Sequence, residues 1–159
     1  MNAIFEQCKM DLQMKLMTEL AKISLMKDSP QWSKPKPLFK KKHHKKVFES
    51  FGIPTGTIGV YRIIYKPTNE TMSIGCGSIG SRLSRHRSVF LNKGKDISHK
   101  SGTTSGSATG GHMYKYDRKR SNWLFSWCDI SNKGLSEQYE VGLQEHEKPP
   151  FNRLSMAGK

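Results

Sequence analysis

The feature that most constrains the fold of this chain is a pair of extended runs joined by a short turn. Residues 57–66 are rich in β-branched and aromatic side chains, and residues 71–75 resume an extended pattern. The four residues between the runs, 67–70, read Pro-Thr-Asn-Glu and are of types that favour turns. The pattern predicts an antiparallel β-hairpin over residues 57–75.

The residues after the hairpin predict a helix and then a long loop. Residues 78–90 place Ile79 and Leu83 on the inward side of a basic helix, because the two lie at helical spacing. Residues 93–111 are rich in Gly, Ser and Thr, a composition typical of loops. We expect weak helix in the second half of this loop.

Two further elements complete the predicted domain. Residues 123–128 read Trp-Leu-Phe-Ser-Trp-Cys, a run that predicts a strand. A helix is expected over residues 135–144, since it follows Gly134 and has Ser136 near its cap. The order strand, strand, helix, loop, strand, helix predicts a small α/β domain of the α+β type over residues 51–159.

The N-terminal residues 1–28 show a different pattern, an apolar stripe at steps of three and four residues. This spacing places the stripe on one face of an amphipathic helix. Such a stripe packs onto the body of the protein or forms a contact between two copies, and the sequence leaves both open. Its members are Ile4, Phe5, Cys8, Leu12, Leu16, Leu20 and Ile23.

Residues 29–50 are expected to form a basic linker or arm. Pro30, Pro35 and Pro37 precede a run of lysines and histidines, a composition that cannot form a packed core. His43 and His44 are adjacent rather than spaced to hold one metal ion, so we reject them as ligands. Contacts with phosphates are expected for Lys40, Lys41, Lys42, Lys45 and Lys46.

The chain as a whole is strongly basic, with 27 Lys and Arg against 13 Asp and Glu in 159 residues. Lys and Arg that neutralise phosphates release condensed counterions, so nucleic acid is the expected partner. No stretch approaches the roughly eighteen apolar residues of a membrane span, which argues against a membrane partner. The cysteines, Cys8, Cys76 and Cys128, predict neither a disulfide framework nor a zinc site, as expected in a reducing cytoplasm.

Several motifs, taken in order, resemble the GIY-YIG nuclease superfamily. Gly59-Val60-Tyr61 matches the first strand motif of that family, and Ser73-Ile74-Gly75 lies where its second motif, Tyr-Ile-Gly, belongs. Arg82-Leu83-Ser84-Arg85-His86 resembles the family's helix with the catalytic arginine. Glu137 lies at a family-like distance before residues 148–152, whose Lys-Pro-Pro-Phe-Asn is similar to the ending of restriction-type and phage endonucleases.

The resemblance covers residues 57–152 and implies a central three-stranded antiparallel sheet flanked by helices. Ser73 departs from it, because a tyrosine at this position lines the active site in the family. Either Tyr61 carries that role alone, or another phenol replaces the missing one, or this chain is slow or inactive. The candidates for a replacement phenol are Tyr65, Tyr114 and Tyr116.

The resemblance also implies roles for the matched side chains. Glu137 would hold one divalent cation, Mg²⁺ or Mn²⁺, because hard oxygen ligands suit a hard ion. Arg82 would bind the non-bridging phosphate oxygens through its planar guanidinium group. Tyr61 would approach the attacking water, as the general base or as the group that positions it.

The remaining expected residues are supporting or DNA-binding. His86 and His99 compete for proton transfer or phosphate contact, since imidazole titrates near neutral pH. Asn152 is expected to support the site by bonding the backbone around the metal-binding helix or the glutamate itself, and Gly75 belongs to the same supporting set. Further DNA contacts are expected for Arg85, Arg87, Lys100, Arg118, Lys119 and Arg120.

These features predict a stand-alone, restriction-like or phage-type DNA endonuclease that hydrolyses phosphodiester bonds with a divalent metal. The expected partner is double-stranded DNA in the cytoplasm of a bacterium or a phage-infected host. Cutting both strands needs two active sites, so we expect a homodimer or a larger assembly, or sequential nicking by one site. The alternatives are a catalytically weakened nucleic-acid-binding protein of the same fold and an RNA-directed nuclease.

Overall fold

The computed structural model describes residues 6–17, 30–39, 52–95 and 108–152. The chain divides into two compact units, Met1–Gln31 and Trp32–Lys159, and each is described by itself. Within the described ranges, no helix has the length and apolar character that a membrane span requires.

The first unit contains a helix over residues 6–17, within the N-terminal segment expected to be helical. Every residue of this helix is exposed, and the side chain of Gln7 donates to Asp11 one turn later at 3.1 Å. The other members of the predicted apolar stripe, Ile4, Phe5, Leu20 and Ile23, lie outside the described residues.

The second unit is built on an antiparallel sheet with the strand order β1-β4-β2-β3. Strands β2 (Ile58–Tyr65) and β3 (Glu70–Ser78) form the expected hairpin, in which Tyr61 lies opposite Gly75. On its other side β2 pairs with β4 (Trp123–Asp129). The predicted class, a mixed fold with helices flanking an antiparallel sheet, is confirmed, although the sheet has a fourth strand.

The fourth strand lies in the segment expected to be a basic linker, residues 29–50. β1 (Lys36–Pro37) pairs with the outer edge of β4, and Leu38 donates its N–H to a β4 carbonyl at 3.0 Å. Ser33 adds further hydrogen bonds to β4, and Leu38 is completely buried. The prolines suit this position, since an edge strand need not donate every N–H. The linker prediction therefore fails for residues 33–38, since β1 belongs to the sheet and Ser33 and Leu38 hydrogen-bond β4 on either side of it.

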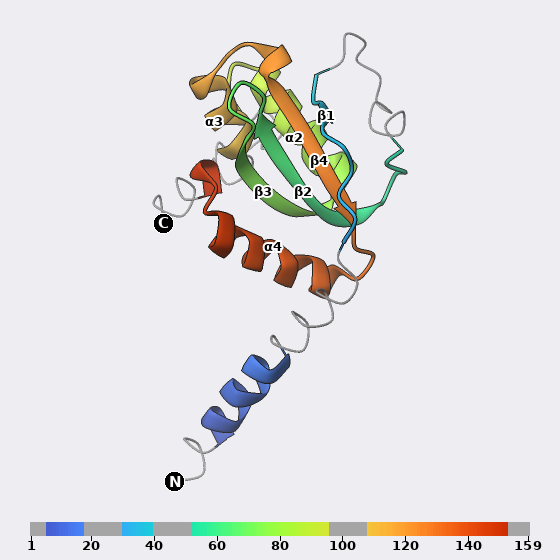
Figure 1. The fold of residues 1–159 in the computed structure, drawn as a ribbon, viewed down its shortest axis with the longest axis vertical. Coiled ribbons are helices and arrows are strands. Elements are labelled where there is room, and N and C mark those ends of the chain that lie inside the picture. Colours follow the sequence, from blue (N-terminus) through green and yellow to red (C-terminus); the bar gives the residue numbers. More distant parts are fainter. Residues whose placement is uncertain (1–5, 18–29, 40–51, 96–107, 153–159) are drawn as a thin grey trace. The chain divides into compact units, whose positions relative to one another are not determined.

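Helices cover both faces of the sheet (Figure 1). α2 (Ile79–Leu91) and α3 (Ala108–Tyr116) lie on one face, and α4 (Lys133–Glu147) lies on the other. Alternate residues of β2 supply the two cores: Tyr61 packs beneath α2, whereas Val60 packs beneath α4. The helix α3 confirms the weak helix expected in the second half of the long loop.

The sequence around α4 sets its ends. Asn132 caps the helix, because its side chain accepts the N–H of Leu135 at 3.1 Å. Ser136, expected near the cap, is buried instead and donates to the carbonyl of Gly59 at 3.4 Å. The helix ends where Lys148 adopts a left-handed conformation before a Pro-Pro pair.

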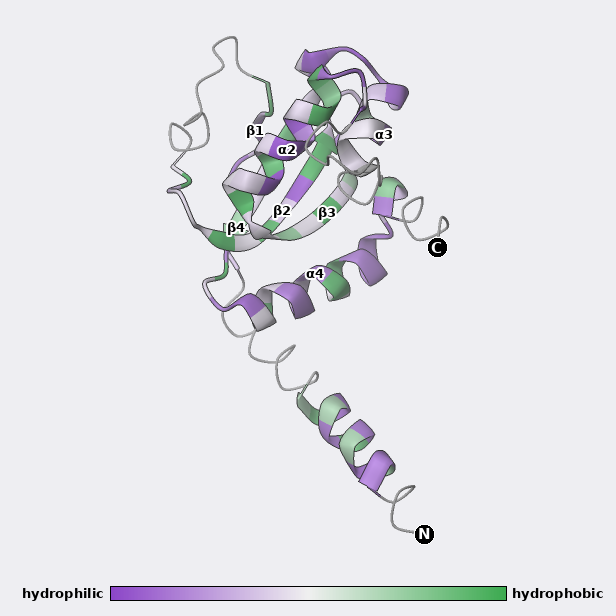
Figure 2. Ribbon diagram, turned by 180° about the vertical axis from the view of Figure 1, so that it is seen from behind, coloured by the Kyte–Doolittle hydropathy of each residue, from purple (hydrophilic) through white to green (hydrophobic). Residues whose placement is uncertain are grey.

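The two cores differ in size and polarity. Hydrophobic residues are concentrated on the strands and alternate with hydrophilic ones along α2, whereas hydrophilic residues predominate on α4 (Figure 2). Trp123 and Phe125 are completely buried in the larger core, between the sheet and α2. The core beneath α4 is smaller, so polar contacts contribute more to holding this helix in place.

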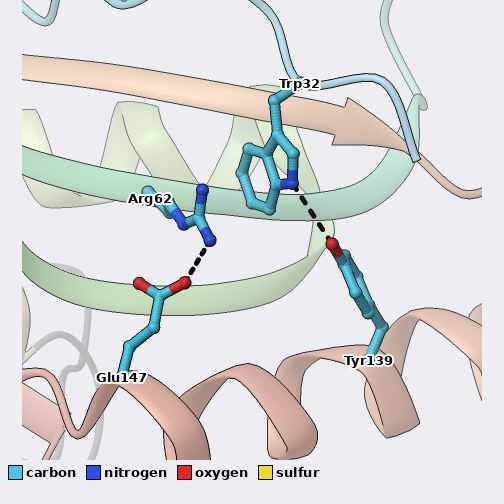
Figure 3. A network of polar contacts seen from close by, with 4 residues as sticks. All are labelled: Trp32, Arg62, Tyr139 and Glu147. Atoms are coloured by element: carbon cyan, nitrogen blue, oxygen red, sulfur yellow. Dashed lines mark hydrogen bonds and ion pairs between the residues drawn. The ribbon is translucent and has the colours of Figure 1, made fainter. Parts of the chain in front are cut away.

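A network of polar contacts joins α4 to β2 and to the segment before β1 (Figure 3). The indole N–H of Trp32 donates to the hydroxyl of Tyr139 at 3.2 Å. Arg62 of β2 forms an ion pair with Glu147 of α4. Its guanidinium also lies 4.0 Å from the centre of the Trp32 ring.

We expect Leu38→Ala to lower the free energy of unfolding by about 2 to 5 kcal/mol, because truncating a buried leucine leaves a cavity. Urea denaturation followed by circular dichroism measures this change. Lys34→Ala is the matched control in the same segment, since Lys34 is exposed. A surface change of this kind should stay within about 0.5 kcal/mol of wild type. Small, equal effects of the two substitutions would show that this segment is a linker after all.

Candidate active site

Tyr61 lies in the middle of β2, and its ring crosses the neighbouring edge strand β3. A side chain at Gly75, the register partner of Tyr61, would overlap the phenolic hydroxyl, so only glycine leaves room for the ring. Tyr61 is 4% exposed. Gly75 therefore supports the position of Tyr61, and the hydroxyl is held directly over the last strand of the sheet.

The Tyr61 hydroxyl lies 2.7 Å from Nε2 of His86 on α2, and both side chains are buried. Burial, followed by the charges of Arg82 and Arg85, lowers the pKa of His86 to about 3. Burial raises the pKa of Tyr61 above its usual value. Both partners are therefore neutral at neutral pH, and their contact is a hydrogen bond between uncharged groups.

Arg82 lies one helical turn before His86 on α2 and is exposed to solvent. It passes Gly77 at the end of β3, where a Cβ atom would lie 3.5 Å from Nε of the arginine. After burial, the positive charge of Arg82 is the largest influence on the pKa of both Tyr61 and His86. The site thus combines a buried neutral pair with an accessible guanidinium group that suits a phosphate.

The α4 carboxylate whose charge acts on Tyr61 belongs to Glu140, three residues after Glu137. Glu140 is half-buried, and after burial and Arg82 it contributes to the raised pKa of Tyr61. Burial and a hydrogen bond to Glu140 raise the pKa of the Cys76 thiol to about 12. Glu137, the expected metal ligand, is exposed and lies 3.9 Å from Lys133 in an ion pair.

Gln144 fixes Glu140 against β3. Its amide nitrogen donates to Oε1 of Glu140 at 2.9 Å and to the carbonyl of Ile74 at 3.0 Å. Ser136, Glu140 and Gln144 recur every four residues, so they lie on the face of α4 that meets the sheet. This spacing is the sequence signal that identifies Glu140, because Glu137 is out of phase with it.

Asn152 binds the same strand from the C-terminal side of α4. Its side-chain oxygen accepts the N–H of Ile74 at 2.8 Å, and its amide nitrogen donates to the Ile74 carbonyl at 2.9 Å. The two bonds replace those that a neighbouring strand would make with the outer edge of β3. The support expected from Asn152 therefore acts on β3 rather than on the helix or its glutamate.

Ser73, at the position of the family's second tyrosine, is 3% exposed and shares a hydrogen bond with Thr109 of α3 at 3.1 Å. The candidates for a replacement phenol are engaged elsewhere. Tyr65 donates its hydroxyl to Asp117 at 2.8 Å. The rings of Tyr114 and Tyr116 pack against other aromatic side chains of the larger core.

The basic residues expected to contact DNA differ in exposure. Arg87 is 6% exposed, lies 5.9 Å from the centre of the Phe39 ring, and has a pKa lowered by burial. It belongs to the core, which corrects its predicted place on the surface. Arg85 is half-buried, whereas residues 118–120 are exposed. Outside the described residues lie Lys40, Lys41, Lys42, Lys45, Lys46, His99 and Lys100.

Neither models of known protein families nor curated protein sequences match this chain. The chemistry of the site therefore rests on its own geometry. Within the described ranges, no three His, Cys, Asp or Glu side chains gather into a metal-binding cluster. A single carboxylate such as Glu140 nevertheless fits Mg²⁺, which keeps several of its waters and takes substrate phosphate oxygens as ligands.

Burial of a neutral His86 makes the stability of the fold depend on pH. Its pKa is about 3 in the folded chain, against 6.5 for an unperturbed histidine, so between these values only the unfolded chain binds a proton. The free energy of unfolding therefore falls as the pH falls through this window. From pH 6.5 to about 4.5, wild type should lose about 2 to 3 kcal/mol more than His86→Gln. Urea denaturation at each pH measures the difference, and parallel profiles would contradict a buried neutral imidazole.

Proposed function

We propose that this chain is a metal-dependent DNA endonuclease of the GIY-YIG type, which hydrolyses phosphodiester bonds. The observation that carries the proposal is the 2.7 Å contact between Tyr61 and the neutral His86, with the exposed Arg82 one turn away. A buried tyrosine with only a packing role would also need a hydrogen-bond partner, but it would not need an exposed arginine beside it. The combination suits a positioned hydroxyl beside a bound phosphate.

In the proposed reaction, the Tyr61 hydroxyl, held by its contact with Nε2 of His86, positions the attacking water, which gives its proton to solvent as it attacks phosphorus. Arg82, exposed one turn before His86 on α2, would hold the phosphate beside this water. The bond from the water oxygen to phosphorus forms as the bond to the 3′ oxygen breaks.

Charge stabilisation would come from both sides of the β3 edge. Arg82 would bind the phosphate oxygens more strongly as negative charge develops on them. A Mg²⁺ or Mn²⁺ ion held by Glu140 would polarise a phosphate oxygen and stabilise the departing 3′ oxygen. Gln144 acts as a positioning residue in this scheme, because its hydrogen bond holds the Glu140 carboxylate.

The net charge of +14 supports double-stranded DNA as the proposed partner, and a homodimer or larger assembly would supply a second site for the other strand. A second candidate function is a catalytically weakened nucleic-acid-binding protein of the same fold. It is favoured by the buried Ser73 at the position of the family's second tyrosine. An RNA-directed nuclease is the third reading, since RNA carries the same phosphate charge.

We expect Tyr61→Phe to slow magnesium-dependent nicking of a supercoiled plasmid by about 10²- to 10⁴-fold, because the attacking water loses the hydroxyl that would position it. Arg82→Ala should slow it by about 10²- to 10³-fold. Gel electrophoresis measures the rates, and thermal melting confirms that each variant is folded. Cleavage that survives both changes would refute the proposed site. Binding without cleavage in Mg²⁺ and Mn²⁺ would favour the weakened binder, and preferential cleavage of RNA would reassign the substrate.

Glu140→Gln and Glu137→Gln form a matched pair, with the same charge change three residues apart on α4. We expect Glu140→Gln to slow cleavage by about 10²-fold or more, since it removes the proposed metal ligand. Glu137→Gln should stay close to wild type, because an exposed ion pair contributes little. The rate measured against Mg²⁺ concentration separates them. If Glu137→Gln is the inactive variant, the metal ligand is Glu137, as the spacing of the resembled family indicates.

A further inference from the structure

Residues 117–122 form a rigid basic turn that the catalytic chemistry does not use. The turn follows α3 and leads through the short helix η2 (Arg120–Asn122) into β4. Its three consecutive cations, at positions 118–120, are all exposed. We call this segment the basic turn.

Asp117 holds the basic turn in one conformation. One of its carboxylate oxygens accepts the Tyr65 hydroxyl at 2.8 Å and the Asn122 amide at 2.7 Å. The other accepts the N–H of Lys119 at 2.8 Å, and the Asp117 carbonyl accepts the indole N–H of Trp123 at 3.0 Å. The hydrogen bonds from Asn122 and Lys119 lower the pKa of Asp117, so the carboxylate is ionised at neutral pH.

The basic turn rests on a base of packed aromatic rings. Trp123 is completely buried, and its ring centre lies 5.2 Å from that of Tyr65 and 6.2 Å from that of Tyr116. The guanidinium of Arg118 lies 5.0 Å from the centre of the Tyr114 ring. These contacts leave the turn little conformational freedom, unlike a run of lysines and arginines in a solvated loop.

The charges of the basic turn favour an anionic ligand. In the described part of the chain, residues 118–120 form no ion pair with an acidic side chain, and three adjacent cations repel one another. A polyanion laid across them would relieve this repulsion. The entropic cost would be low, because the conformation of the turn is already set.

Strand β2 fixes the position of the basic turn relative to Tyr61. Tyr65, which binds Asp117, follows Tyr61 by four residues on β2, so their side chains share one face of the sheet about 13 Å apart. The turn and Tyr61 are therefore held at a fixed separation by one strand.

We propose that the basic turn is a preformed phosphate-binding surface that anchors the backbone of double-stranded DNA away from the cut. The proposal rests on the nuclease function for its partner, but it concerns binding rather than the chemical step. Contacts of this kind raise affinity and set the register of the duplex without reading its sequence.

The test measures binding of a labelled DNA duplex by fluorescence anisotropy in EDTA over a series of salt concentrations. Arg118→Ala/Arg120→Ala removes two charges from the turn. Lys34→Ala/Lys133→Ala is the matched control, because both residues are exposed and Lys133 begins α4, beyond the far end of β4. Asp117→Asn makes the chain one charge more positive, yet it loosens the turn.

Loss of two phosphate contacts should reduce the slope of log affinity against log salt by about 1.8, at about 0.9 per contact. The control pair should change the slope by less than half as much. Asp117→Asn should bind about 3- to 10-fold more weakly, because side chains freed from the turn must be ordered again on binding. Charge alone predicts the opposite sign for this variant.

Two results would overturn the proposal: equal losses for the two double variants, or binding by Asp117→Asn that is unchanged or tighter. If Arg118→Ala/Arg120→Ala weakens binding to single-stranded RNA as much as binding to the duplex, the assignment to double-stranded DNA is overturned. If Asp117→Asn does not fold, Tyr65→Phe replaces it, since it removes one hydrogen bond without a charge change and should also weaken binding. Failure of wild type to cleave would refute the nuclease function, but the comparison in EDTA would still decide the role of the turn.

Discussion

The arrangement of this domain depends on the side chains that hydrogen-bond the outer edge of β3 at Ile74. This residue is 1% exposed, so its N–H and carbonyl need partners inside the protein. Asn152 pairs with both groups, and Gln144 shares the carbonyl. These bonds set the register of α4 and of the residues that follow it against the sheet. Because Gln144 also binds Glu140, the hydrogen bonds at the edge of β3 determine where the Glu140 carboxylate lies.

The same edge is approached from the opposite face of the sheet by α2. The Tyr61 ring crosses Gly75 to reach His86, and Arg82 lies one turn away. Helices on opposite faces of a sheet are separated by its full thickness, except at an edge strand, where no further strand intervenes. The charges of Arg82 and Glu140 both act on Tyr61 because the site lies at such an edge.

Burial divides the charged and titratable groups of the domain into core and surface groups. His86 and Tyr61 are neutral because they are buried, and Arg87 is drawn into the core beside Phe39. The cations of the basic turn stay at the surface. The Asp117 carboxylate accepts hydrogen bonds from a backbone N–H and from neutral side chains, and not from the charged groups of the turn. A basic composition therefore predicts the class of partner, but the place of each cation is a property of the folded chain.

Local patterns in the sequence sufficed for the hairpin, for α2 with Arg82 and His86 one turn apart, and for the aromatic strand β4. They sufficed because alternation, helical spacing and turn chemistry act between residues close in the chain.

Other features needed the tertiary structure. β1 is two residues long and gains its pairing from a strand almost ninety positions away, so no local pattern predicts it. The rotation of α4 that turns Glu140 inward, and Glu137 to solvent, follows from bonds made with β3. The contact between Tyr61 and His86 likewise joins a strand to a helix. The sequence by itself determined which elements form and which residue types they carry. Only tertiary packing decided which side chains meet, because the phase of a helix against a sheet is set by long-range contacts.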